Sequence, residues 1–227
     1  MSDPAPYNPL DKRNLGASVA EALLGRKSRV LKDLKSFSGA GIYAIYYTGK
    51  FPAYQKLAEQ NRGDSPVAPI YVGKAIPAGG RKGASSLAGA TTRALFGRLK
   101  EHAESIDATK NLQVDDFLCR YLVVDDIWIP LGESLLIAKF APIWNTLIDG
   151  FGNHDPGKGR YNGMRPKWDV LHEGRSWAER CQPRRETASQ IEREIKAHLN
   201  VLNAPMSPHF YAEQNRARYG ELPSHDD

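Results

Sequence analysis

Two short runs rich in aromatic and β-branched residues constrain the fold of this chain more than any other feature. They are Gly41–Tyr47 and Ile70–Lys74, each bounded by Gly or Pro, which is typical of β-strands. Side chains alternate between the two faces of a strand. If the two strands pair, Tyr43 and Tyr71 can stand side by side, and Gly73 leaves space beside them. The pattern therefore predicts that this face of the two strands forms the base of an active site.

The remaining apolar periodicity predicts an α+β fold. Phe117–Val124 is almost continuously apolar and is expected to form a central third strand. We therefore expect a small central three-stranded β-sheet flanked by helices. Helical spacing and end signals place these helices at Asn14–Leu24, from Thr91 or Thr92 to Ile106, from Leu131 or Gly132 to Phe140, and at Gln190–Leu199.

Length and composition favour one elaborated domain over residues 1–227. We divide it into an N-terminal helical arm (1–40), a core (41–145) with an insertion (48–69), and a basic C-terminal extension (146–227) for DNA binding and dimer contact. The net charge of +5 permits a nucleic-acid partner without proving one.

Cysteine usage and hydropathy point to a soluble protein in a reducing compartment. Cys119 and Cys181 are too few for a disulfide framework or a four-thiolate zinc site, and we expect two inert or buried thiols. No apolar run approaches the roughly 20 residues that span a bilayer. We expect a cytoplasmic protein with no membrane contact.

Four polar residues that could take part in catalysis follow the two predicted strands along the chain. Arg98 and His102 are four positions apart, so they share one face of the predicted helix. Glu133 is expected in the first turn of the next helix, and Asn145 follows that helix.

These elements resemble the signature of the GIY-YIG nucleases: GIY and YVG in the two strands, then RxxxH, a glutamate and an asparagine. The resemblance covers residues 41–145 and implies hydrolysis of DNA phosphodiesters by a GIY-YIG-like core. One departure is the insertion 48–69, because most nucleases of this type connect the two strands by a much shorter segment.

A carboxylate suits Mg²⁺, which keeps several waters and takes one or two protein carboxylates. Glu133 is therefore the candidate metal ligand, for Mg²⁺ with Mn²⁺ as a substitute. The alternative is a carboxylate placed at a helix N-terminus by the helix dipole. A single carboxylate favours a one-metal mechanism.

The resemblance and the chemistry together assign the other candidate catalytic residues. Arg98 offers forked donors to a phosphate. Tyr43 is the candidate general base or water-positioning group, with Lys74 and Arg98 expected to lower its pKa. His102 has three alternatives: proton shuttle, phosphate ligand or packing residue. The general base remains open between Tyr43 and His102. Tyr71 would orient its neighbours, and Asn145 would position the site.

Two basic segments are candidates for DNA contact. Ala75–Lys100 contains no acidic residue, and Gly150–Arg185 interleaves arginines with aromatic residues. Arginine and lysine bind phosphates or donate to guanine in the major groove. The candidate DNA-binding residues are Arg81, Lys82, Arg93, Lys158, Arg160, Arg165, Lys167 and Arg175.

Within the family, the insertion and the residues around Arg98 and Asn145 look like restriction endonucleases that cut the palindrome CCGCGG. This resemblance implies a type II enzyme, a homodimer on double-stranded DNA, and a partner DNA methyltransferase. Two alternatives stay open. One is a repair or mobile-element nuclease of the same fold, and the other is a DNA-binding module without catalytic activity.

Overall fold

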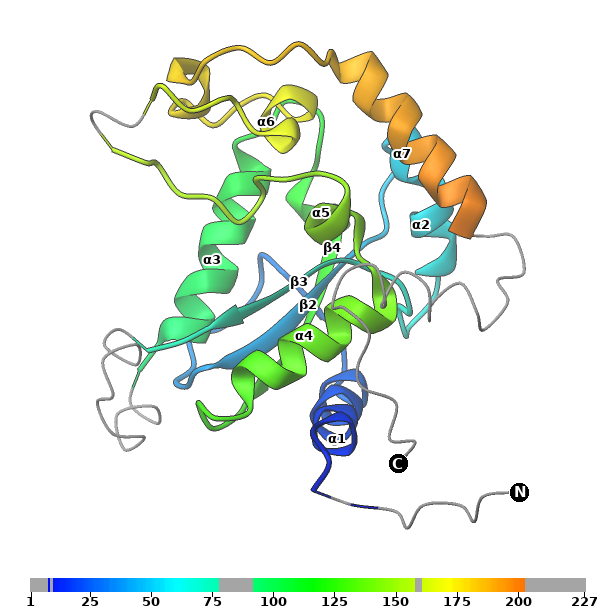
Figure 1. Ribbon diagram of the computed structural model, residues 1–227, viewed down its shortest axis with the longest axis vertical. Coiled ribbons are helices and arrows are strands. Elements are labelled where there is room, and N and C mark those ends of the chain that lie inside the picture. Colours follow the sequence, from blue (N-terminus) through cyan, green and yellow to red (C-terminus); the bar gives the residue numbers. More distant parts are fainter. Residues whose placement is uncertain (1–7, 9, 78–91, 158–160, 203–227) are drawn as a thin grey trace, which may run out of the picture.

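A four-stranded antiparallel sheet forms the centre of the molecule, in a computed structural model that describes residues 8, 10–77, 92–157 and 161–202 (Figure 1). The strand order is β1-β4-β2-β3, with β1 at Arg29–Val30, β2 at Gly41–Tyr47, β3 at Pro69–Ala75 and β4 at Phe117–Val123. Helices flank the sheet, so the predicted α+β class is confirmed.

The sheet has one strand more than predicted. β1 pairs with β4 through Arg29 opposite Cys119 and Val30 opposite Leu118. A two-residue strand beginning with an exposed arginine carries no alternation that a sequence pattern can reveal. As predicted, β4 is an interior strand, because it lies between β1 and β2.

Two hydrophobic cores cover the two faces of the sheet. On one face α1 (Lys12–Leu24) and α4 (Ile129–Phe140) pack against the Ile42 side of β2. On the other face α3 (Ala94–Asp107) packs against the Tyr43 side. Figure 1 shows α3 on the opposite side of the sheet from α1. β2 is therefore buried along its whole length.

The insertion between β2 and β3 folds as a compact unit. It contains η1 (Pro52–Tyr54) and α2 (Gln55–Gln60), and one buried side chain, Asn61, closes it. Asn61 Nδ2 donates to the carbonyls of Tyr47 (3.0 Å) and Ala68 (2.8 Å), and its Oδ1 accepts from Val67 N (3.0 Å) and Ala68 N (2.8 Å). The ends of the insertion are thus held together, which lets β2 and β3 pair across a long connection.

A buried arginine on the interior strand β4 joins two loops. Arg120 donates to the Arg26 carbonyl (2.7 Å), the Pro66 carbonyl (2.6 Å) and Ser65 Oγ (2.9 Å). Its guanidinium lies over the ring of Tyr46 at 5.0 Å. These partners belong to the α1–β1 turn and the insertion, so Arg120 has a structural role there.

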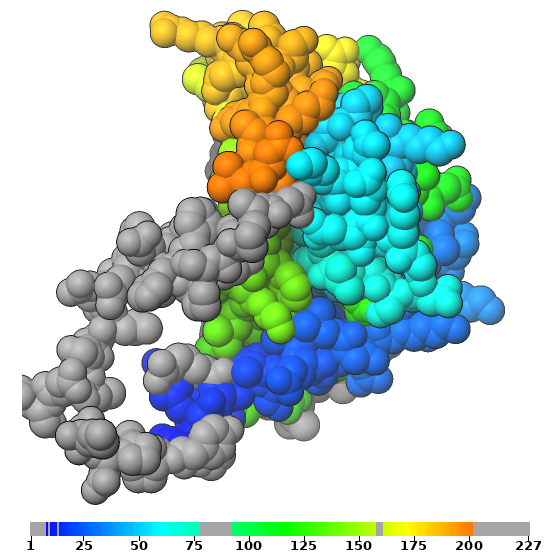
Figure 2. All heavy atoms as spheres, turned by 90° about the vertical axis from the view of Figure 1, so that its right-hand side faces the viewer, coloured from blue at the N-terminus to red at the C-terminus, as the bar shows by residue number. Residues whose placement is uncertain are grey.

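The C-terminal part wraps over the α3 face of the sheet. Its helices are α5 (Ile143–Thr146), α6 (Lys167–Leu171), η5 (Ala178–Arg180) and α7 (Ala188–Leu202). Another short helix, η4 (Val114–Asp116), lies earlier in the chain, directly before β4. Turning the molecule shows α7 beside the insertion (Figure 2), in agreement with its contacts to η1.

A buried hydrogen-bond chain ties this part to the insertion. Tyr54 Oη lies 2.6 Å from His172 Nε2 and accepts from Trp144 Nε1 at 2.9 Å. His172 Nδ1 lies 2.9 Å from Asn111 Oδ1, whose amide donates to the Leu171 carbonyl. The pattern assigns the proton of His172 to Nδ1, so Tyr54 donates to Nε2. Burial lowers the pKa of His172 to about 3.

Two helix starts differ from the sequence prediction. α4 begins at Ile129, two or three residues earlier than expected, with Pro130 in its first turn. Glu133 therefore lies beyond the first turn, and the prediction that it sits in that turn is wrong. α3 begins at Ala94, with Thr92 Oγ1 accepting from Ala94 N at 3.2 Å.

The cysteine prediction is confirmed, since Cys119 and Cys181 are both free and buried. Burial raises the pKa of the Cys119 thiol to about 12, which keeps it protonated and unreactive. Among the described residues, no helix is both long and apolar enough to cross a membrane.

Candidate active site

The floor of the candidate site is the pairing of β2 with β3. Tyr43 stands opposite Gly73, and its ring lies 6.2 Å from that of Tyr71, so the two tyrosines are neighbours as predicted. A Cβ at Gly73 would lie 2.4 Å from Tyr43 Oη, closer than real Cβ contacts come. Glycine is therefore required here to leave room for the phenol.

The helix α3 brings His102 onto this floor. His102 Nε2 lies 2.6 Å from Tyr43 Oη, and both residues are buried. Burial lowers the pKa of His102 well below its ordinary value, and the nearby positive charge of Arg98 lowers it further. His102 is therefore neutral at neutral pH and able to accept a proton at Nε2.

The pKa of Tyr43 moves in the direction opposite to the sequence prediction. Burial raises it well above 10, and the charge of Tyr71 adds to this, while Arg98 only partly offsets the rise. The second expected cation, Lys74, lies on the other face of β3. Without DNA and metal, the phenol is therefore protonated, and Tyr43 alone is a poor base.

Arg98 lies one helical turn before His102, as the four-residue spacing predicted. Its Nη1 lies 2.9 Å from Glu101 Oε2 and 2.6 Å from His154 Nε2, and its Nη2 donates to the Gly152 carbonyl at 2.5 Å. The side chain is only 18% exposed. The guanidinium is thus held in one orientation before any substrate binds.

Phe151 and Gly152, two residues that the sequence analysis did not name as site residues, complete this side of the site. The ring of Phe151 stacks on His102 at 4.5 Å and 17°, and meets Tyr71 edge-on at 5.0 Å. A Cβ at Gly152 would lie 2.7 Å from Tyr71 Oη. The only sequence sign of this close approach is the Gly-Phe-Gly triplet starting at Gly150.

Glu133, the candidate metal ligand, lies on the opposite face of β3 from Tyr43 and Tyr71. Lys74 faces α4 because it pairs in register with Ile42, and its Nζ lies 2.6 Å from Glu133 Oε2. The charge of Glu133 nevertheless raises the pKa of both Tyr43 and Tyr71. The Lys74–Glu133 pair and the two tyrosines therefore interact electrostatically across β3. Among the described residues, no cluster of three or more His, Cys, Asp or Glu could hold a metal.

Asn145 holds the edge strand rather than entering the cluster. Its Oδ1 accepts from Val72 N and its Nδ2 donates to the Val72 carbonyl, both at 2.8 Å. This paired arrangement imitates a neighbouring strand. It fits the positioning role proposed from the sequence, because Val72 precedes Gly73.

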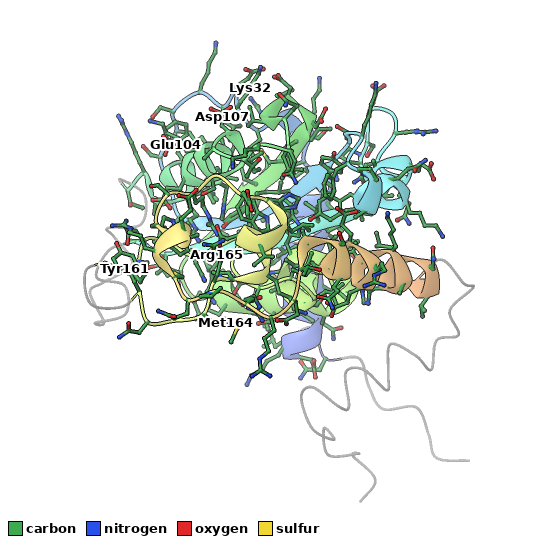
Figure 3. The ribbon with its side chains drawn as sticks, turned by 90° about the horizontal axis from the view of Figure 1, so that it is seen from above. Lys32, Glu104, Asp107, Tyr161, Met164 and Arg165 are labelled. Carbon is green, nitrogen blue, oxygen red and sulfur yellow. The ribbon has the colours of Figure 1, made fainter. Side chains whose placement is uncertain are left out.

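The candidate DNA-binding residues take different positions. Arg81, Lys82, Lys158 and Arg160 lie outside the described residues. Arg93 is exposed just before α3. Arg165 donates to the carbonyls of Ala178 and Glu179, and Lys167 pairs with Glu194 of α7 at 2.9 Å. Figure 3 shows Arg165 with Tyr161 and Met164 on the segment that precedes α6.

Arg175 does not fit the DNA contact predicted for it. Only 6% of the residue is exposed, and its guanidinium pairs with the buried Asp169 at 2.6 Å. A buried, paired guanidinium has no free donor to offer a phosphate or a base. Because this stretch contains many arginines, the sequence did not distinguish Arg175, which has a structural role, from arginines that could contact DNA.

The sheet and this cluster define a nuclease of the GIY-YIG type. Residues 35–199, well over half of the chain, match the family model described as the Eco29kI GIY-YIG domain, and the chain belongs to this family of restriction-type nucleases. DNA is accordingly a partner of this domain. No curated protein matches the chain.

Proposed function

We propose that this protein is a type II restriction endonuclease that hydrolyses double-stranded DNA at a short GC-rich palindrome, CCGCGG. The observation that carries the proposal is the close approach of Tyr43, His102 and Arg98 beside the glycine-lined floor of β2 and β3. These groups supply what phosphodiester hydrolysis needs: a proton acceptor, a water-orienting hydroxyl and a fixed cation.

The buried pair divides the proton transfer between two residues. The Tyr43 hydroxyl orients the attacking water and takes its proton, while its own proton passes to Nε2 of neutral His102. The imidazolium formed in this way is stabilised by the negative charge that grows on the phosphate. This arrangement explains how a tyrosine with a raised pKa takes part in base catalysis.

Arg98 binds a non-bridging oxygen of the scissile phosphate. Its contact with the Gly152 carbonyl keeps the guanidinium plane fixed, so little reorganisation is needed when the charge develops. The hydroxyl of Tyr71 lies beside it and completes the donor set.

The donor chemistry of Glu133 fits Mg²⁺, with Mn²⁺ as a substitute. Its carboxylate is 17% exposed, beside the aqueous edge of β3, where a hydrated ion with one protein ligand can be accommodated. Bound there, the ion would supply Lewis-acid stabilisation of the leaving 3′ oxygen. Lys74, which pairs with Glu133 and is 38% exposed, would contact the DNA backbone beside this carboxylate.

The palindrome implies a homodimer, since two-fold symmetry places one site on each strand. A cell that carries such an enzyme needs a DNA methyltransferase to protect its own sites. The exposed Arg93 and the basic segments that flank the core would contact the duplex.

The test is digestion of a sequenced phage DNA by the full chain, with Mg²⁺ and with EDTA. Discrete, Mg²⁺-dependent fragments whose ends map to CCGCGG sites in the phage sequence would support the proposal. Fragments with another end sequence would reject that site, and a smear would reject sequence specificity. DNA binding without cleavage of any substrate would favour a binding module.

A further inference from the structure

The segment from Gly150 to His154, here called the Phe151 segment, touches both catalytic side chains of α3. Phe151 stacks on the imidazole of His102, and the Gly152 carbonyl accepts from Arg98. Tyr43 and Tyr71 of the sheet also interact with both side chains, so the Phe151 segment adds a loop contact to this cluster. A shift of the Phe151 segment would therefore change the surroundings of both side chains at once.

One buried arginine holds the Phe151 segment by its backbone. Arg175 Nη2 donates to the Gly150 carbonyl at 2.9 Å. Its Nη1 donates to the carbonyls of Phe151 and Asn153, both at 3.1 Å. Three of the carbonyls around Gly152 are thus bound to a single guanidinium.

The same guanidinium is itself locked in place. Its Nε and Nη2 donate to the two carboxylate oxygens of Asp169 at 2.7 and 2.6 Å. Its Cζ lies over the rings of Trp168 at 4.5 Å and Trp177 at 4.7 Å. All five of its N–H groups donate hydrogen bonds, and the side chain is 5% exposed.

This geometry requires arginine. A lysine carries the same charge but has three donors on one atom, so it cannot bind Asp169 at two points and also reach three carbonyls. Replacement by lysine keeps the charge of the ion pair and changes the support of the Phe151 segment.

We propose that Arg175, braced by Asp169, is a positioning residue for DNA cleavage, acting through the Phe151 segment on His102 and Arg98. The inference rests on the proposed nuclease function and goes beyond it, because Arg175 acts without touching DNA. A misplacement of catalytic groups by about 1 Å can cost about a hundredfold in rate.

The test compares Arg175→Lys with Arg120→Lys, a matched control. Arg120 is likewise buried, binds loop carbonyls and lies over an aromatic ring. It pairs in register with Ala44, so it lies on the sheet face opposite Tyr43. Both variants are assayed below their melting temperatures. For Arg175→Lys we expect single-turnover cleavage to fall by at least about tenfold, with the Kd for DNA in Ca²⁺ changed by less than about threefold. Arg120→Lys should cut at the wild-type rate.

Cleavage by folded Arg175→Lys at the wild-type rate would overturn the proposal. So would a loss of DNA affinity that matches the loss of rate, because Arg175 would then be a DNA contact. An equal loss of rate in Arg120→Lys would reduce the effect to general destabilisation.

A second readout is independent of activity. The ring of Phe151 shifts the NMR signals of the His102 imidazole, so Arg175→Lys should move these signals and Arg120→Lys should not. Unchanged His102 signals in Arg175→Lys would overturn the positioning role even if the wild type proved to cut no DNA. An inactive wild type with shifted signals would reject the nuclease function and support the positioning role.

Discussion

The phenol oxygen of Tyr43 lies 2.6 Å from Nε2 of His102, and both side chains are buried at the junction of β2 and α3. The neutral imidazole faces a protonated phenol, so the pair is ready to pass a proton. The same pairing occurs again between Tyr54 and His172, at 2.6 Å and away from the site. This repetition supplies an internal control.

Tyr43→Phe should slow DNA cleavage by at least about a hundredfold, because it removes the hydroxyl that takes part in proton transfer. Tyr54→Phe also leaves a buried histidine nitrogen unpaired, so both variants should lose about 1–3 kcal/mol of unfolding free energy. Only Tyr43→Phe should lose cleavage, measured in single-turnover assays below both melting temperatures. Equal rates for the two variants would remove the Tyr43 hydroxyl from the mechanism.

Glu133→Gln should bind DNA and cut it at least about a hundredfold more slowly, if the metal supplies several kcal/mol to the barrier. The control is Glu104→Gln on α3, where 64% of the glutamate side chain is exposed and its partner is Lys100. Gel shifts measure binding, and digestion over a range of Mg²⁺ concentrations measures rate. Cleavage by Glu133→Gln at the rate of the control would exclude Glu133 as the ligand.

Gly73→Ala should destabilise the fold by about 1–3 kcal/mol and reduce cleavage, because the added methyl group meets Tyr43 Oη at 2.4 Å. Gly97→Ala on α3 is the control, since a Cβ there has no neighbour within 4 Å. In a helix this change should stabilise by about 0.5–1 kcal/mol. Urea unfolding of both variants checks the signs, and a neutral Gly73→Ala would mean that the tyrosine can move aside freely.

Acid should destabilise the protein through its buried histidines. The folded-state pKa of His172 is about 3 and that of His102 is also lowered, while the unfolded values are near 6.5. Below pH 6.5 the unfolded chain binds more protons, so each group removes up to about 1.4 kcal/mol of stability per pH unit. The stability that they contribute is fully present above pH 6.5.

His172→Gln tests this assignment. The variant should be less stable than the wild type at pH 7.5, because glutamine cannot reproduce both hydrogen bonds of the imidazole. By pH 5 the difference in unfolding free energy should shrink by about 2 kcal/mol, since the variant no longer has a histidine to protonate. A difference that stays constant between pH 7.5 and pH 5 would contradict the lowered pKa of His172.

Features set by local periodicity were predicted from the sequence. Alternation along a strand brought Tyr43, Tyr71 and Gly73 together, and the helical repeat put Arg98 and His102 on one face. The insertion obscured the strand pairing, since nothing in the pattern showed that Asn61 would close it.

Features that depend on tertiary burial were missed. The depth of Tyr43 reverses the expected shift of its pKa. Arg175 looked like a DNA contact because its buried partner, Asp169, lies in the short helix α6, which the sequence analysis did not predict. The contact of Phe151 with His102 joins residues far apart in the sequence, and no spacing rule relates them.

The hydrogen bonds from Asn145 to Val72 also limit how copies of this chain can associate. β3 is an outer strand, and exposed outer strands readily accept a strand from another molecule. Asn145 occupies both backbone groups of Val72 on that side, so a continuous intermolecular sheet cannot form across this point. A two-fold assembly would therefore use a surface other than this edge of β3, which would leave the edge beside Gly73 free for DNA.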